Sequence, residues 1–354
     1  MVRVKPQKPY GPCRLTGDVG PYVKSHLIPL ALTRLSGSGA KFLEAGIGLG
    51  KKRRSNSWYD LGLVTRKGED ILAEIDDAGI EILREHRLVW SSWAANALKD
   101  EGLQELDTAG LFRFIKIQNP AVLQLFFLSL LWRAGASDRD EFSDVVLSSD
   151  VLVDLTDRIV RRDAGNFMDY PVQLFQLSTK GVMHNRTPIL ERKWTLGLDG
   201  SRGPDVDYVR FYLDGLVAHV HIGREVSFPE GYELSCLSSI DATTVFQNDF
   251  KESRTWENMQ EMMETVEREH LTAPGRRTMI VSALVNAWPR RSDSIDAPKL
   301  QGPVVVVPSV GSEGPLDDVS EDLQRRLSAF EQALARQAAA LDLNGANGSE
   351  AEVQ

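Results

Sequence analysis

The sequence predicts an α+β protein, and three patterns along the chain lead to this class. Apolar residues spaced three and four positions apart predict helices between about residue 68 and residue 162. Alternating apolar and polar residues over 207–223 predict a β-hairpin. Segments rich in Gly, Pro and Ser separate these patterns. We therefore expect an N-terminal module at 10–95, a mixed helical and β-hairpin domain at 100–272, and a flexible extension at 273–354.

Three helices are expected before residue 163. The first follows Gly68, and acids in its first turn suit the positive end of the helix dipole. Its apolar face consists of Ile71, Leu72, Ile75, Ala78, Ile82 and Leu83. The second runs from about Asn119 through Trp132, with Pro120 in a favourable first-turn position. The third, at about 148–162, begins in the sequence SSD, which supplies a cap.

The β-hairpin is the clearest local prediction in the second half of the chain. Val209, Phe211 and Leu213 alternate with polar residues before the turn-forming pair Asp214-Gly215, and the alternation resumes after it. A strand is also expected just after Pro171, and another around Cys236, whose thiol we expect to be a small buried group.

Composition narrows the classes of protein that fit. The 354 residues are 42% hydrophobic, enough for an ordinary core, and carry a formal net charge of −9. This charge excludes a protein that coats nucleic acid through its overall field, but it allows a local basic patch. Two distant cysteines cannot build a disulfide framework or a four-cysteine zinc site, which fits a reducing, cytoplasmic location.

No membrane association is expected. The N-terminus lacks the apolar segment of a signal peptide. The most apolar run, Ala121 to Trp132, is shorter than the roughly 18 residues that a spanning helix needs and contains Gln124 and Ser129. We therefore interpret this run as a buried helix.

Chemistry-bearing residues are ordered in a distinctive way near the N-terminus. Cys13 and Thr16 flank a short turn, the run His26-Leu27-Ile28-Pro29 follows, and the segment from Trp58 to Leu72 contains LVTRKGED. This order resembles a divergent HNH (ββα-metal) endonuclease-like module, over about a quarter of the chain. The resemblance implies an N-terminal HNH-like ββα fold. It also implies that His26 deprotonates a water molecule while a divalent ion, Mg²⁺ or Mn²⁺, stabilises the scissile phosphate.

The second half of such a site would need acidic ligands. Asp60, Glu69 and Asp70 are the acids placed near it, and the resemblance makes them the expected metal ligands. Several positions depart from the family pattern. Ser25 precedes His26 where active members carry an acid or a His, and Thr16 replaces a thiolate. We therefore expect no structural zinc, because such sites need four strong N or S donors.

Two functions remain open at this point. The first is a DNA-binding protein that acts as a metal-dependent endonuclease. The alternative is a catalytically inactive scaffold or regulatory subunit that binds protein partners. The two differ in one observation. The endonuclease requires His26 to converge with two or more of four acids around a space that fits a metal ion: Asp18, Asp60, Glu69 and Asp70.

A basic cluster supports the DNA-binding interpretation. Lys51, Lys52, Arg53 and Arg54 follow a stretch rich in Gly and Ser, which predicts a mobile loop able to contact a phosphate backbone. Trp58 and Tyr59 come just after it and could stack on a base. In the alternative interpretation the loop is solvated and the two aromatic residues anchor the next strand.

Two further patterns have a functional and a plain interpretation. His219 and His221 lie on the same face of the predicted strand, so both could bind one ion, with Glu225 and His184 as further ligands. The plain alternative is the polar outer face of the hairpin.

Residues 250–270 predict an acidic helix, and 317–343 predict an amphipathic helix suited to self-association or to a partner protein. The apolar side of the second helix consists of Val319, Leu323, Leu327, Phe330, Leu334 and Leu341.

Overall fold

The structure is a computed structural model. It describes residues 9–33, 42–46, 49–54, 58–93, 112–181, 185–196, 202–223, 226–237, 242–253, 256–257 and 260. The described helices are α1 (Leu30–Thr33), α2 (Arg66–Glu85), α3 (Pro120–Ala136) and α4 (Ser149–Arg161). Short 3-10 turns are η1 (Trp90–Ser92), η2 (Asp140–Phe142), η3 (Phe167–Asp169), η4 (Tyr232–Ser235) and η5 (Phe250–Glu252).

The strands fall into one large sheet and three small ones. Six strands form the large sheet in the order β10-β11-β12-β8-β13-β7, where β8 and β13 are parallel and the other neighbours antiparallel. Its strands are β7 (Phe112–Ile115), β8 (Val172–Leu177), β10 (Ile189–Leu196), β11 (Arg202–Leu213), β12 (Leu216–Ile222) and β13 (Thr243–Asn248). The small sheets contain β1 (Tyr10–Pro12) with β2 (Val19–Pro21), β3 (Ser25–His26) with β6 (Tyr59–Asp60), and β5 (Leu49–Arg54) with β4 (Phe42–Gly46) and β9 (Asn185–Arg186).

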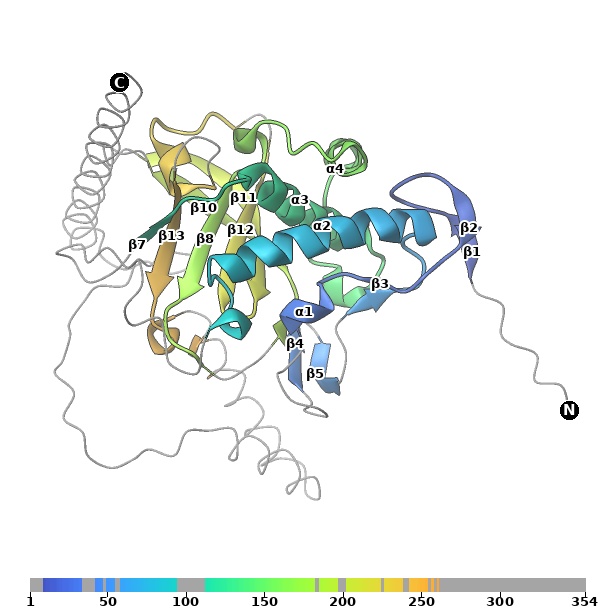
Figure 1. Cartoon of the computed structure of the whole chain (residues 1–354), viewed down its shortest axis with the longest axis horizontal. Coiled ribbons are helices and arrows are strands. Elements are labelled where there is room, and N and C mark those ends of the chain that lie inside the picture. Colours follow the sequence, from blue (N-terminus) through green and yellow to red (C-terminus); the bar gives the residue numbers. More distant parts are fainter. Residues whose placement is uncertain are drawn as a thin grey trace, which may run out of the picture.

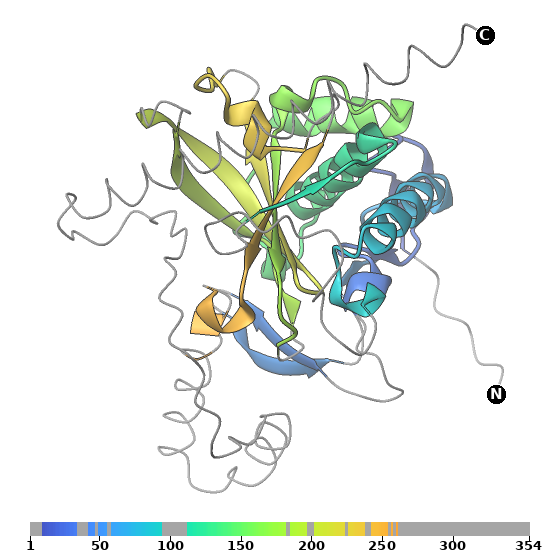
Figure 2. The same ribbon diagram turned by 60° about the vertical axis from the view of Figure 1, so that its left-hand side comes forward.

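The helices gather on one side of the large sheet (Figure 2). Figure 1 shows α2 crossing in front of the strands, with the β1-β2 hairpin beyond one of its ends. The mixed α+β class expected from the sequence is confirmed. Buried apolar residues from Cys13 to Val245 form one continuous core, so the expected boundary at 95–100 does not separate two cores among the described residues.

The three expected helices are confirmed. In α2, Ile71, Leu72, Ile75 and Leu83 are buried, whereas Ala78 and Ile82 are half-buried. In α3, thirteen of seventeen residues are buried, including Gln124 and Ser129, so this apolar run is a buried helix as predicted. Ser148 caps α4 because its side chain accepts a hydrogen bond from the Val151 amide.

The β-hairpin prediction is also confirmed. Strands β11 and β12 pair up to Leu213 and Leu216, on either side of Asp214-Gly215. Both turn residues have positive φ, 52° and 88°, the conformation in which Gly is favoured and Asp is tolerated. The expected strand around Cys236 is wrong. Cys236 instead ends the turn η4, although its thiol is buried as predicted.

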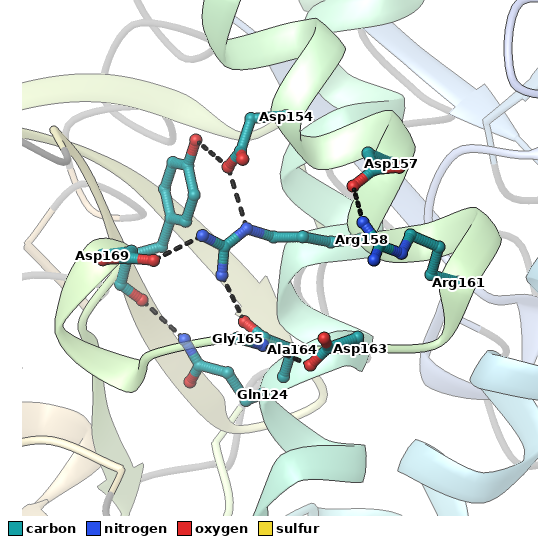
Figure 3. A network of polar contacts seen from close by, with 10 residues as sticks. Gln124, Asp154, Asp157, Arg158, Arg161, Asp163, Ala164, Gly165 and Asp169 are labelled. Atoms are coloured by element: carbon teal, nitrogen blue, oxygen red, sulfur yellow. Dashed lines mark hydrogen bonds and ion pairs between the residues drawn. The ribbon is translucent and has the colours of Figure 1, made fainter.

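A polar network attaches the end of α4 to the segment that leads into the large sheet (Figure 3). Arg158 lies at its centre, where it bonds Asp154 at 2.8 Å, Asp169 and the Ala164 carbonyl oxygen. The Tyr170 hydroxyl donates to the same Asp154 carboxylate at 2.8 Å. These contacts hold α4 in place over α3.

Two sequence predictions lie mainly or wholly outside the described residues. The predicted C-terminal helix at 317–343 is one, and most of the predicted acidic helix at 250–270 is the other. Within the ranges that the structure does describe, no helix has both the length and the apolar character needed to cross a membrane.

Candidate functional site

His26 lies on β3, the first of two short paired strands, and the second of them, β6, comes before α2 in the chain. β3 pairs with β6 in antiparallel fashion, so that Ser25 is opposite Asp60 and His26 is opposite Tyr59. α2 begins six residues after β6. The chain therefore has a strand–strand–helix arrangement at the place where the sequence resemblance was found.

The turn that contains Cys13 packs on the start of α2. The Gly17 amide donates to the Cys13 carbonyl oxygen at 2.8 Å, and the Thr16 amide donates to the Cys13 Sγ at 3.4 Å. A Cβ at Gly68 would lie 2.7 Å from this sulfur. Only glycine therefore allows the turn to approach the helix so closely.

The surroundings of Cys13 are polar but lack thiolate partners. The hydroxyl oxygen of Thr65 is buried and makes no hydrogen bond within the described part of the chain. Burial raises the pKa of the Cys13 thiol, but hydrogen bonds from Thr16 and from the backbone at Thr65, Thr16 and Leu15 outweigh this effect and lower it. A single sulfur among threonines and glycine is not the donor set of a structural zinc site.

Arg133 is the charged centre of the His26 region. Its side chain, only 1% exposed, comes from α3 and forms a two-pronged ion pair with Asp76 of α2, one arm of which measures 2.9 Å. The same guanidinium donates to the His26 carbonyl oxygen at 2.9 Å and to the Ser129 Oγ at 2.9 Å. One cation thus joins α2, α3 and β3.

Glu69 is the one predicted metal ligand that turns toward this centre. Burial raises the pKa of its carboxyl group, while the Ser25 hydroxyl and the charge of Arg133 act to lower it. Asp76 adds a further negative charge nearby. Glu69 therefore lies near Ser25, and the positive charge that acts on its carboxylate is the guanidinium of Arg133.

The other predicted ligands contact different groups. Asp60 accepts hydrogen bonds from the Ser137 hydroxyl at 2.6 Å and from the Gly62 amide at 2.7 Å. Asp70 is exposed and pairs with Arg66 at 3.6 Å, one turn away on α2. Asp18 pairs with Lys67 at 2.9 Å.

The donor set around His26 does not fit a divalent ion. The described residues contain no group of three or more His, Cys, Asp and Glu side chains placed to hold a metal. Ser25 offers a hydroxyl where a charged ligand would be needed, and Arg133 supplies a positive charge beside the acids. We therefore derive no reaction step through Mg²⁺ or Mn²⁺.

The basic cluster at 51–54 lies on a strand, so the predicted loop is wrong at these residues. Lys51, Lys52, Arg53 and Arg54 belong to β5, which pairs with β4 so that Arg54 is opposite Phe42 and Arg53 is opposite Leu43. The alternation of apolar and polar residues that marks most half-buried strands is absent here, which explains the error. β5 forms one edge of the small sheet β5-β4-β9.

The two aromatic residues that follow this strand are not exposed on the surface. Trp58 is 1% exposed and packs edge-on against Phe142, with ring centroids 6.1 Å apart, so it does not offer a stacking face. Tyr59 is half-buried beneath the Lys24 ammonium, which lies 4.2 Å from its ring centroid. The anchoring interpretation therefore applies to Trp58.

His219 and His221 do share a face of β12, but that face is covered. His221 is fully buried, with Nδ1 2.7 Å from the Pro171 carbonyl oxygen and Nε2 2.9 Å from the Tyr232 hydroxyl. Both ring nitrogens thus have partners in the protein, and the expected outward polar face is wrong. The further ligands suggested by the sequence, Glu225 and His184, lie outside the described residues.

Sequence reasoning missed Arg133 and Asp76. A signal for Arg133 exists in retrospect, because it is the one charged residue in the seventeen residues of α3. A cation within a buried helix requires a compensating anion. Asp76 carries no comparable signal, since acidic residues are common along α2.

Comparison with protein-family models, with curated proteins and with solved structures gave no match.

Proposed function

We propose that this chain binds DNA through strand β5 and that its His26 module acts as a scaffold without metal-dependent cleavage. The observation that carries the proposal is the placement of four consecutive cationic residues, Lys51 to Arg54, on β5. This strand is the edge of the three-stranded sheet β5-β4-β9, in which β5 and β4 pair as an antiparallel ribbon. A ribbon of two strands fits the major groove of B-DNA, and cations along it neutralise phosphates.

The position of the ribbon supports a contact with a large partner. β4 and β5 lie at the lower end of the molecule in both views, below α2 and α3 (Figures 1 and 2). Binding must be local, because the net charge of the chain is −9.

The scaffold part of the proposal rests on Arg133. A metal-dependent nuclease would use the acids near His26 to hold its ion. Here Arg133 pairs with Asp76 and acts on Glu69, and Asp60 and Asp70 are engaged elsewhere. This arrangement favours the inactive alternative over the endonuclease.

A plasmid-nicking assay tests the scaffold claim. The full chain and a His26→Ala variant are incubated with supercoiled plasmid and Mg²⁺ or Mn²⁺. We expect no nicking by either protein. Nicking by the wild type that disappears in His26→Ala would overturn this part of the proposal and support the endonuclease.

A binding assay tests the role of β5 separately. We expect fluorescence anisotropy of a labelled duplex to report binding by the wild type and its loss, by tenfold or more, after replacement of the four cations with Gln. The matched control removes the same charge from exposed arginines elsewhere, at Arg161, Arg162, Arg192 and Arg202. An equal loss of DNA affinity in the control would show that binding depends on the net charge of the chain and not on β5. Absence of binding by the wild type would refute the proposal and favour a protein partner.

A further inference from the structure

A cluster of polar and nucleophilic side chains lies on the face of the large sheet opposite the helices. Apolar residues such as Leu174, Phe211 and Val220 belong to the core that includes α3. Their neighbours along the same strands point the other way because side chains alternate. On that second face lie Lys193 of β10, Tyr208 of β11, His219 and His221 of β12 and Gln173 of β8.

Lys193 is the central group of this cluster. Its residue is 4% exposed, and its Nζ contacts the Gln173 Oε1, lies 3.5 Å from the His219 Nδ1, and sits 4.8 Å from the ring centroid of Tyr208. None of these partners is a carboxylate. Among the described residues, Lys193 forms no ion pair with a carboxylate.

The nearest acid on its own strand is engaged with other groups. Glu191 accepts a hydrogen bond from the Tyr208 hydroxyl at 2.7 Å and pairs with Arg210 at 3.6 Å. A buried ammonium without a close anion is costly, so the environment favours the neutral amine. Burial lowers the pKa of Lys193 to about 7, against the opposing influence of Cys236 and Glu191.

A single segment covers the cluster. Residues 226–237 place the Tyr232 hydroxyl 2.9 Å from the His221 Nε2 and the Ser235 hydroxyl 2.6 Å from the Gln173 Nε2. Cys236 ends the turn η4 in the same segment, and burial raises the pKa of its thiol to about 12. Cys236 therefore stays a thiol, and Lys193 is the nucleophile of the cluster.

We propose that Lys193 is the reactive amine of a second site on this face, and that it takes a small aldehyde or ketone as an imine when segment 226–237 lifts from the sheet. The cluster of groups around Nζ suits this reaction. A buried, neutral lysine amine is the usual nucleophile for carbonyl compounds.

The step balances without a further reagent. The Nζ lone pair attacks the carbonyl carbon, and one of the two amine protons passes to the carbonyl oxygen, which becomes a hydroxyl. His219 accepts the second amine proton and returns it to that hydroxyl, which leaves as water when the C=N bond forms. One amine and one carbonyl compound thus give one imine and one water.

Reductive ethylation with acetaldehyde and cyanoborohydride tests the proposal on the full chain. N-acetyl-lysine amide in the same tube serves as the reference amine, and peptide mass spectrometry gives the extent of labelling at Lys193. An ordinary lysine titrates near pH 10.4, whereas an amine that titrates near 7 is already half neutral at pH 7. We expect the labelling rate of Lys193 relative to the reference to fall about 50-fold from pH 7 to pH 9.

Two variants separate the possible outcomes. His219→Phe keeps a ring at the position but removes the nitrogen, and we expect it to lower labelling of Lys193 at pH 7 by about tenfold. Lys193→Met must lose the labelled peptide. The titratable groups that contact Lys193 or act on its charge are Glu191, Tyr208, His219, His221 and Cys236. Arg210 and Tyr232 contact Glu191 and His221 in turn. Labelling of Lys193 only after unfolding, or a ratio to the reference that does not change with pH, would overturn the proposal.

Discussion

Replacement of Arg133 by Met removes the charge that joins α2, α3 and β3 while keeping most of the aliphatic stem. The change leaves the Asp76 carboxylate, 15% exposed, without its cation, and leaves the His26 carbonyl oxygen without its donor. Breaking a buried pair by removing one partner typically costs about 3–5 kcal/mol. Because Asp76 retains some contact with water, we expect the lower end, about 3 kcal/mol.

Urea denaturation followed by tryptophan fluorescence measures this loss. The matched control is Arg162→Gln. Arg162 is exposed and pairs with Glu74, which lies on α2 as Asp76 does. An exposed pair contributes roughly 0–1 kcal/mol, so the control should unfold close to the wild type. The double variant Asp76→Asn with Arg133→Met should be more stable than Arg133→Met alone, because no uncompensated charge remains. A cost below about 1 kcal/mol for Arg133→Met would refute the assignment of a buried charged centre.

Three further predictions follow from the packing and the charges. Gly79→Ala should destabilise by about 1–3 kcal/mol in thermal unfolding, since a Cβ would lie 2.4 Å from the Phe126 ring on α3; a gain in stability, the usual effect of Ala in a helix, would contradict the close approach. Gly165→Ala should cost about 1–3 kcal/mol, because φ is +66° and a Cβ would collide with Arg158 (Figure 3); unchanged stability would count against the network. The pKa of Lys193 is lower in the folded chain than in the unfolded chain, so between pH 7 and 10 the unfolded chain binds more protons. The contribution of Lys193 to the free energy of unfolding should therefore rise with pH in this window and fall as the pH drops toward 7. Lys193→Met should flatten that rise in urea titrations, and an unaltered pH profile in the variant would show that Lys193 is not its source.

The fold class and several elements could be predicted because their signals are local. The apolar spacing in α2 and the pair Asp214-Gly215 specify a helix and a turn within a few residues. The strand β5 could not be predicted, because Lys51 to Arg54 have no alternation and acquire their structure from pairing with β4. Strand β10, with Lys193, was missed for a similar reason: its identity depends on pairing with β11.

The candidate site was predictable only in part. His26 and Glu69 could be placed on a strand and a helix from their neighbours in the sequence. The convergence of Arg133 and Asp76 depends on the packing of α2 against α3, which joins residues 57 positions apart. No pattern in a single sequence reports such a contact, so the ion pair between Arg133 and Asp76 emerges only from the tertiary structure.

DNA affinity measured across a range of salt concentrations tests the central claim most directly. Each phosphate contact adds about 0.9 to the downward slope of log affinity against log salt. If β5 is the DNA-binding strand, replacing Lys51 to Arg54 by Gln should make that slope shallower by about 2–4, whereas the exposed-arginine control should keep the wild-type slope. Equal slopes for the wild type and the β5 variant would contradict the account.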